Sequence, residues 1–322
     1  MKGQIGQKIE RARQLGIRLG VLKAIGYEAE FTYAYRRKNM PTGLVEDTKS
    51  EFTVYDRLDD YWYADPLIYC YKGKEYVFME AYERRTDLGR IAVAEVSDVG
   101  LGEPEVIMAE EFHLSFPVLF EINKKIYMIP ETSTADQVIL YECENFPKVW
   151  KKSTEFFKGR QVVDIVPVCR KNNEIIFVGS ECMKNSLQVR FFAFSIAFGA
   201  KLTAKEEKDY NALQKYDYRS RNGGYMVGGM FVLQESTQGI YGRNLQFATS
   251  SQSLPQELKI YKKIEPRNIR LKKGKIKHII GTHTYSCTEH YELIDVQYMR
   301  FNSKKWINRY RNSKKNEKET PN

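Results

Sequence analysis

The sequence predicts an all-β protein, and in particular a five-bladed β-propeller with a short N-terminal extension and a basic C-terminal tail. Helical periodicity is scarce after about residue 50 of the 322-residue chain. Short runs instead alternate between apolar and polar residues and end at Gly, Asn or Lys, which is typical of antiparallel strands. Five of these runs resemble one another and recur at a nearly constant spacing.

Each of the five runs has the pattern of a strand, a polar turn and a second strand that ends on a polar residue. The runs cover residues 65–82, 116–133, 164–181, 222–237 and 267–284. The polar residues near their ends are separated by 51, 49, 54 and 48 positions: Glu80, Glu131, Ser180, Gln234 and Thr282. A period near 50 in an all-β sequence indicates propeller blades, each a four-stranded sheet. Five copies therefore predict five blades.

The segments on either side of the repeats are harder to interpret. We expect the propeller to span residues 50–300, after an N-terminal extension of residues 1–49 and before a basic, partly disordered tail of residues 301–322. Residues 8–26 allow two interpretations: a short basic helix, or, at "GIRLGVL", a strand that completes the last blade and closes the propeller. The next stretch, "EFTYAYRRKNMP", alternates again before the first full blade.

Composition limits the possible cellular setting. Five widely spaced cysteines without a CxxC pair predict reduced thiols, not a disulfide framework or a zinc site. No apolar run approaches the roughly 18 residues of a membrane span, and the first residues do not have the apolar core of a secretory signal. We therefore expect a cytoplasmic protein. We also expect no metal and no cofactor, since no His cluster and no DxD motif in a suitable context is present.

The net charge of +10 is concentrated in two places. Residues 259–277 hold nine Lys or Arg against one Glu, and residues 303–322 hold seven against two, with aromatic residues among them. Such segments suit nucleic acid or an anionic membrane surface. The chain has no nucleic-acid-binding motif, so we expect no nucleic-acid partner. The tail then either contacts the inner face of a membrane or is a solvated segment that aids solubility.

Polar residues at one blade position suggest a site. Glu80, Glu131 and Gln234 recur at the same place in three repeats. A buried glutamate is costly unless it is paired or hydrogen-bonded. Either these residues bond backbone amides between neighbouring blades, or they form a polar ring around one end of the channel and bind a substrate.

Several stretches are specific enough to indicate a family. "ADPLIYCY" (64–71), "FHLSFP" (112–117) and "MIPET" (128–132) are the clearest. Over about residues 50–300 the chain resembles a family of five-bladed propellers. That family includes the N-terminal domain of plant glucosamine inositolphosphorylceramide transferase and bacterial proteins linked to surface-polysaccharide synthesis. It is in turn similar in fold to furanoside-acting glycosidases such as arabinanases, xylosidases and levansucrases.

This resemblance implies positions for catalytic groups. The glycosidases use a base in the first blade, a pKa-tuning Asp in the third and a general acid Glu in the fourth. Asp65 and Asp164 match the first two positions, whereas the fourth blade opens with "YRSRNGGY", which holds Arg219 and Arg221. A guanidinium does not donate its proton near neutral pH, but it does stabilise a departing phosphate. The presence of arginines where the glycosidases have a general acid favours a transferase over a hydrolase, unless the arginines pair with the aspartates in an inactive site.

Further residues are assigned to the same site. His113 enters the second blade where an Asp stands in the first, and is expected to act as a base or to bond a sugar hydroxyl. His283 ends a fifth-blade strand and is expected to bind substrate. Tyr241 either lies under a sugar ring or packs between blades. Trp62 and Tyr63 form either a stacking platform or part of the core.

Three functions follow from these observations. The favoured one is a glycosyltransferase-like enzyme of capsule or surface-polysaccharide synthesis. It would move a sugar, a furanose if the preference of the fold carries over, from a phosphate-activated donor to a lipid-linked glycan acceptor. The first alternative is a non-catalytic glycan-binding or scaffold propeller. The second is a glycoside hydrolase of the furanosidase type.

Overall fold

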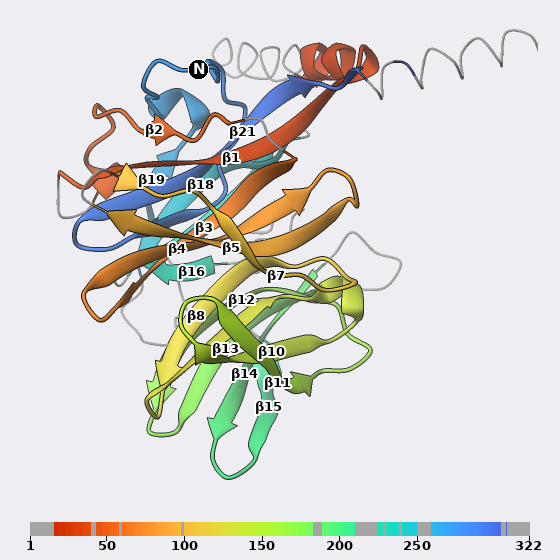
Figure 1. Cartoon of the computed structure of the whole chain (residues 1–322), viewed down its shortest axis with the longest axis vertical. Coiled ribbons are helices and arrows are strands. Elements are labelled where there is room, and N and C mark those ends of the chain that lie inside the picture. The colour runs from red at the N-terminus through yellow and green to blue at the C-terminus, as the bar shows by residue number, and fades with distance from the viewer. Residues whose placement is uncertain are drawn as a thin grey trace, which may run out of the picture.

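The five predicted blades are present as five antiparallel sheets arranged in a ring (Figure 1). The computed structural model describes residues 16–39, 43–57, 60–97, 100–182, 189–209, 224–227, 230–237, 240–249, 259–303 and 307. Short 3-10 helices lie at Gly43–Val45 (η1), Ser133–Ala135 (η2) and Pro266–Asn268 (η3). The all-β propeller that the sequence predicts is therefore confirmed.

The first four blades follow the chain in order, with the first strand of each nearest the axis. Blade 1 contains β3 (Tyr61–Tyr71), β4 (Lys74–Glu83), β5 (Leu88–Ser97), β6 (Gly100–Leu101) and β7 (Glu105–Met108). Blade 2 contains β8 (Ser115–Ile122), β9 (Lys125–Glu131), β10 (Val138–Asn145) and β11 (Val149–Phe156). Blade 3 contains β12 (Val162–Lys171), β13 (Glu174–Cys182), β14 (Val189–Phe198) and β15 (Leu202–Asp209). Blade 4 contains β16 (Gly224–Val227), β17 (Met230–Thr237), β18 (Ile240–Thr249) and β19 (Lys259–Ile264).

Blade 5 is built from both ends of the chain, and this closes the ring. Its order is β20 (Tyr285–Cys287), β21 (Tyr291–Phe301), β1 (Tyr27–Arg37) and β2 (Thr53–Val54). Figure 1 shows β1, in red, beside β21, in blue, and the two strands pair along their whole length from Tyr27 to Arg37. Residues 16–24 are helical, so "GIRLGVL" is not the closing strand. The longer alternating run that follows it supplies that strand.

A buried ion pair fixes this closure. The Arg36 Nε of β1 lies 2.6 Å from the Glu292 Oε1 of β21, and both side chains are almost fully buried. The second oxygen of Glu292 accepts bonds from the Leu44 N–H and the Tyr285 hydroxyl. Arg36 also donates from Nη1 to the backbone carbonyl of Ser50 and from Nη2 to that of Asp47. Every partner lies in blade 5 or just beside it, so the network joins the two chain ends.

The predicted fifth hairpin, residues 267–284, is wrong in position. That stretch contains η3 and an extended segment with isolated bridges at Leu271 and Gly281, whereas the hairpin is β20–β21. The Lys-rich run offers too few apolar residues to bury a central strand, and "YELIDVQYMRF" offers many. In blade 1, Ala64 pairs with Glu80 just before the register between the two inner strands breaks. In blade 5, the pair at the corresponding position is Gly281 with Gln297. Gln297, not Thr282, therefore holds the repeat position.

Aromatic and aliphatic side chains fill the spaces between the sheets. Between blades 2 and 3, for example, the Phe120 ring lies 5.4 Å from the ring of Phe177, which stacks on Phe194. No disulfide links the five cysteines, all of which lie in the described part of the chain. In the same part of the chain, no helix has the length and apolar character needed to cross a bilayer.

Candidate functional site

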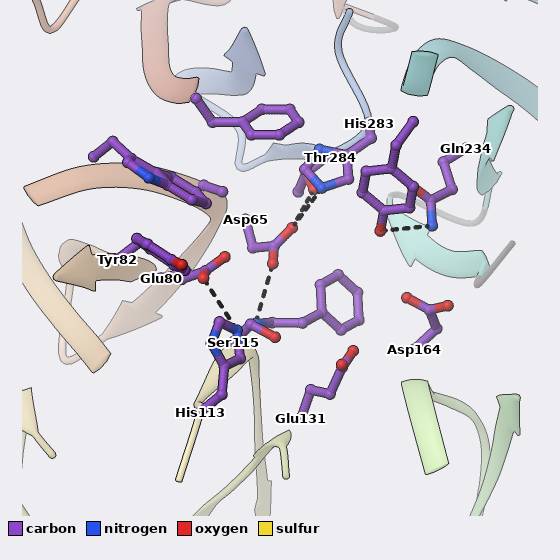
Figure 2. Close-up of a pocket in the computed structure, with 15 residues that line it drawn as sticks. Asp65, Glu80, Tyr82, His113, Ser115, Glu131, Asp164, Gln234, His283 and Thr284 are labelled. Atoms are coloured by element: carbon purple, nitrogen blue, oxygen red, sulfur yellow. Dashed lines mark hydrogen bonds and ion pairs between the residues drawn. The ribbon is translucent and has the colours of Figure 1, made fainter. Parts of the chain in front are cut away.

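The innermost strands surround one pocket of about 270 Å³ at the centre of the ring (Figure 2). Four acidic residues from blades 1, 2 and 3 line it: Asp65, Glu80, Glu131 and Asp164. Two histidines, His113 and His283, lie among them, and Gln234 and Tyr241 come from blade 4. All five blades thus contribute polar side chains to one cavity.

A repeated backbone irregularity points side chains into this pocket. Asp65, Phe116 and Asp164 have left-handed backbone angles, with φ of 51°, 44° and 53°. Each lies in a register break between the first two strands of its blade. Such a bulge takes a residue out of the normal alternation of the strand, and the left-handed conformation is uncommon outside glycine. His283 lies in the corresponding break of blade 5, between the pairs that Gly281 and Tyr285 make.

Asp65 links three blades. Its Oδ1 accepts a hydrogen bond from the Thr284 hydroxyl at 2.8 Å, and its Oδ2 accepts one from the Phe116 N–H at 3.2 Å. Thr284 belongs to blade 5 and Phe116 to blade 2, so the carboxylate of blade 1 is held from both sides. Burial raises the pKa of Asp65, while the neighbouring His283 opposes that rise. An ionised carboxylate with a raised pKa is a stronger base than an ordinary aspartate.

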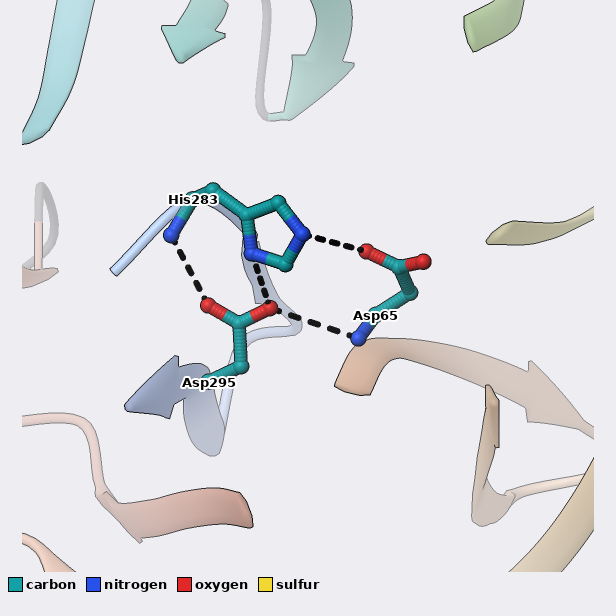
Figure 3. Close-up of side chains that lie close together, drawn as sticks. All are labelled: Asp65, His283 and Asp295. Carbon is teal, nitrogen blue, oxygen red and sulfur yellow. Dashed lines mark hydrogen bonds and ion pairs between the residues drawn. The ribbon is translucent and has the colours of Figure 1, made fainter. Parts of the chain in front are cut away.

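His283 lines the pocket and lies between the carboxylates of Asp295 and Asp65 (Figure 3). Its Nδ1 is 2.5 Å from the Asp295 Oδ2, and its Nε2 is 3.5 Å from the Asp65 Oδ1. Burial alone would lower the pKa of His283, but Asp295, Asp65 and Glu80 outweigh it and raise this pKa to about 9. The same contacts lower the pKa of Asp295 despite its complete burial. His283 is therefore an imidazolium at neutral pH.

Asp65, His283 and Asp295 also have the composition of a metal site, and their ligand atoms lie within 4.8 Å of one another. Their hydrogen bonds argue for a different arrangement. The Asp295 Oδ1 accepts the N–H groups of His283 and Thr284, and its Oδ2 accepts the N–H of Asp65. Both ring nitrogens of His283 face carboxylate oxygens. The imidazolium thus supplies the positive charge itself, and the donor set fits a hydrogen-bonded triad better than a metal ion.

A second carboxylate–imidazole pair joins blades 1 and 2. The His113 Nε2 lies 3.2 Å from the Glu80 Oε1, and the Gly89 N–H donates to the His113 Nδ1 at 2.9 Å. Because Nδ1 accepts a bond, the ring proton lies on Nε2 and points to Glu80. Burial opposes protonation of His113, but Glu80 outweighs it and raises the pKa of His113. Gly89 is required here, because a Cβ at this position would clash with the Leu114 carbonyl oxygen and lie 2.7 Å from the His113 Cε1.

The opposite side of the pocket carries Glu131, Asp164 and the blade 4 residues. Glu131 Oε1 accepts a bond from the Ser133 hydroxyl at 3.1 Å. Gln234 Nε2 donates to the Tyr241 hydroxyl at 3.4 Å, and both residues line the pocket. Burial of the hydroxyl, together with the carboxylates of Asp164 and Asp65, raises the pKa of Tyr241. The Tyr241 hydroxyl therefore stays protonated and can donate to a ligand.

Aromatic rings form one wall. Trp62 stacks on Tyr82 with ring centroids 4.4 Å apart, and Phe31 lies 5.9 Å from Trp62 and 4.6 Å from His283. Tyr63 instead is buried in the core beside Tyr33, because neighbouring residues of a strand point to opposite faces. Of the two predicted platform residues, only Trp62 lines the pocket. An apolar wall opposite carboxylates suits a ligand with one apolar face and a rim of hydroxyls.

Eight of the ten residues that the sequence assigns to a site lie together on this cavity. The other two, Arg219 and Arg221, lie outside the described residues. Sequence reasoning missed Asp295, Thr284, Tyr82 and Phe31. The only signal for Asp295 was a charged residue inside the apolar run "YELIDVQYM". Phe31 could not be placed because its strand reaches the pocket only after the ring has closed.

The fold and the pocket define the class: a five-bladed β-propeller with an acidic, aromatic-walled cavity at its axis. The family model described as the N-terminal part of glucosamine inositolphosphorylceramide transferase 1 matches residues 54–310, and the chain belongs to this family. This confirms the resemblance that the sequence motifs indicate.

Curated plant relatives cover only part of the chain. Glucosamine inositolphosphorylceramide transferase 1 of Arabidopsis thaliana is 30% identical over 194 residues, which are 57% of this chain and 25% of that protein. The protein of the same name from Oryza sativa subsp. indica is 34% identical over 92 residues, 27% of this chain and 12% of that protein. The chain therefore spans at most about a quarter of the length of these relatives.

Solved structures with a similar fold include two that are named as glycosidases. A β-xylosidase/α-arabinofuranosidase from a compost metagenome has a TM-score of 0.49 at 13% identity, covering 77% of this chain and 94% of that one. An α-L-arabinofuranosidase from Podospora anserina has a TM-score of 0.49 at 10% identity, covering 83% and 97%. These likenesses concern the fold and carry nothing about the reaction.

Proposed function

We propose that the central pocket holds a sugar residue during a glycosyl transfer in glycan biosynthesis, with Asp65 as the base that activates the acceptor. The convergence of Asp65, Glu131, Asp164 and the Trp62–Tyr82 stack on one cavity supports this most strongly. Carboxylates accept bonds from sugar hydroxyls, and an aromatic face packs against the C–H face of the ring. The volume of about 270 Å³ lies just below the range of about 300–1,000 Å³ for drug-sized ligands, so it suits one sugar unit.

The proposed reaction is a single displacement at the anomeric carbon of a phosphate-activated sugar. An acceptor hydroxyl oxygen forms the new bond to that carbon while its proton passes to Asp65. The bond from the anomeric carbon to the phosphate oxygen breaks, and the diphosphate leaves with the electron pair. Thr284 and the Phe116 N–H hold the Asp65 carboxylate in place, and the His283 imidazolium favours its ionised form. Arg219 and Arg221 remain the sequence-based candidates for the leaving phosphates.

The setting we propose is synthesis of a surface glycan at the inner face of a membrane. The family link to glycan synthesis and the excess of seven Lys or Arg over two Glu in residues 303–322 favour a lipid-linked acceptor and a peripheral contact through the basic tail. In this proposal the protein works in the cytoplasm. Co-sedimentation with phosphatidylglycerol vesicles before and after deletion of residues 303–322 tests the membrane contact, and unchanged binding would contradict it.

Asp65→Asn tests the proposed chemistry, because it preserves the shape of the side chain and removes the base. The purified protein is incubated with a panel of nucleotide sugars and oligosaccharide acceptors, and release of nucleoside diphosphate is measured. We expect a loss of about 10²- to 10⁴-fold in turnover, the usual contribution of a general base. Asp60→Asn is the matched control, since Asp60 is exposed and does not line the pocket. Full activity in Asp65→Asn, or release of free sugar with water as the acceptor, would overturn the transferase.

A non-catalytic glycan-binding propeller is the second candidate. It is favoured by the match of this chain to the N-terminal part, at most about a quarter, of the plant transferases. In that case Asp65→Asn would leave pathway activity unchanged, while Trp62→Ala would abolish binding of oligosaccharide. Calorimetric titration with free oligosaccharides separates the two functions.

A further inference from the structure

A second hollow, larger than the central pocket, lies beside blade 4 and has no role in the proposed chemistry. Its volume is about 970 Å³, and it is bounded by β18, β19, η3 and the extended segment that follows η3. Six cationic side chains line it, against the single acid Glu265: Arg243, Lys263, Arg267, Lys272, Lys273 and Lys277. Most of these belong to the basic stretch 259–277, whose purpose the sequence alone does not explain.

Internal ion pairs account for only two of the six cations. Lys263 pairs with Glu235 at 2.5 Å, and Arg267 pairs with Glu265 at 2.6 Å. The other four make no ion pair with any residue that the structure describes. The only acid in the lining is thus already engaged, and the hollow keeps a strong positive potential.

Arg243 is the most informative of these residues. It is half-buried on β18, and its side chain makes neither an ion pair nor a hydrogen bond with any described residue. Burial lowers the pKa of Arg243, and the more distant Glu265 and Glu235 only partly offset this. A guanidinium that is partly removed from water and has no acid beside it is unfavourable. A bound anion would remove this cost.

The wall that carries the lysines is held in a defined conformation. A backbone bond joins the Phe52 N–H to the Arg270 carbonyl, and another joins the Lys272 N–H to the Phe52 carbonyl, each at 2.8 Å. At the far end the Ile280 N–H donates to the Gln297 carbonyl at 2.7 Å. The cations therefore project from a segment that is tied to blade 5 at both ends.

The hollow and the central pocket share a wall. On β18, Tyr241 lines the pocket and Arg243, two residues on, lines the hollow. On the neighbouring segment, His283 lines the pocket and Ile280 the hollow. The two segments touch, since a Cβ at Gly281 would lie 2.6 Å from the Gly242 carbonyl. A ligand whose sugar occupies the pocket would therefore lie next to the basic hollow, since the same two segments line both.

We propose that this hollow is a diphosphate-binding site, with Arg243 as its central ligand and Lys272, Lys273 and Lys277 around it. The planar guanidinium suits phosphate oxygens, and the lysines add charge. The assignment of this diphosphate to a sugar donor or to the lipid carrier of an acceptor rests on the proposed function. Anion binding itself does not.

Calorimetric titration of the full chain with inorganic pyrophosphate tests the site without any turnover. We expect Arg243→Gln to weaken binding about tenfold, the loss of one charge-assisted contact. Arg270→Gln is the matched control: it removes the same charge from an exposed neighbour outside the hollow, and its affinity should stay at the wild-type level. If Arg243→Gln does not fold, the double variant Lys272→Gln/Lys273→Gln, at two exposed positions, takes its place.

Two results would overturn the site: no pyrophosphate binding at low salt, or an equal loss in Arg243→Gln and Arg270→Gln. The source of the diphosphate is separated by a second titration with uridine diphosphate and by sedimentation with phosphatidylcholine vesicles, with and without phosphatidylglycerol. Binding of the nucleotide alone identifies a soluble donor. Vesicle binding that depends on Arg243 and is displaced by pyrophosphate identifies a lipid-borne phosphate. Pyrophosphate binding together with an inactive pocket would leave this site intact and refute only the proposed transfer.

Discussion

Raising the pH from about 6 to about 10 should destabilise the propeller through one residue, His283. The imidazolium lies between Asp295 and Asp65, and its pKa is raised from an ordinary value of 6.5 to about 9. A group whose pKa is higher in the folded protein than in the unfolded chain stabilises the fold, and this contribution is fully present at pH values below the pKa of the unfolded chain. That stability is lost as the pH rises through the folded pKa. The relevant window therefore runs from about 6.5 to about 9.

The size of the effect follows from the same two values. Each pKa unit corresponds to about 1.4 kcal/mol, so the difference between 6.5 and about 9 is worth about 3 kcal/mol of unfolding free energy. The His283 side chain is only 9% exposed, so solvent screening reduces this little. A loss of about 3 kcal/mol is a large fraction of the unfolding free energy of native proteins, which is usually about 5–15 kcal/mol.

Urea denaturation at a series of pH values measures this loss, with His283→Gln as the reference that lacks the titrating group. The difference in unfolding free energy between the two proteins should shrink by about 3 kcal/mol across the window. Imidazole NMR resonances give the pKa directly, and the chain has only four histidines to assign. A His283 that titrates at or below 6.5, or a difference that is flat with pH, would refute the charged triad.

Two further changes test the architecture around the pocket. Gly89→Ala places a methyl group against the Leu114 carbonyl oxygen and the His113 ring, so the segment that carries His113 must shift. We expect glycan affinity or turnover to fall and the unfolding free energy to drop by about 1–3 kcal/mol; unchanged binding in a folded variant would show that binding does not need His113 in this position. Arg36→Met leaves Glu292 buried without its cation and should cost about 3–5 kcal/mol in denaturant unfolding, and a loss below about 1 kcal/mol would mean that the pair does not hold the ring closed.

Local pattern predicted most of the blades because each hairpin carries its own alternation of apolar and polar residues. Four of the five predicted runs coincide with the inner hairpins of blades 1 to 4. The fifth was displaced because residues 267–284 alternate without enough apolar side chains for a central strand, while β21 satisfies that need. The closing strand was uncertain for a related reason: β1 is stable only against β21, its partner from the other end of the chain.

The sequence by itself determined that the chain is a five-bladed propeller and which repeat positions carry polar side chains, since period and alternation are properties of neighbouring residues. Only the tertiary structure decided that Asp65, Asp164, Glu131 and His113 share one cavity, because ring closure sets the distances between blades. It also decided the charge of His283, which depends on Asp295 being 2.5 Å away, and the lack of an ion pair between Arg243 and any acid that the structure describes. Charge and proximity in a buried site are properties of the assembled ring, and no single strand contains them.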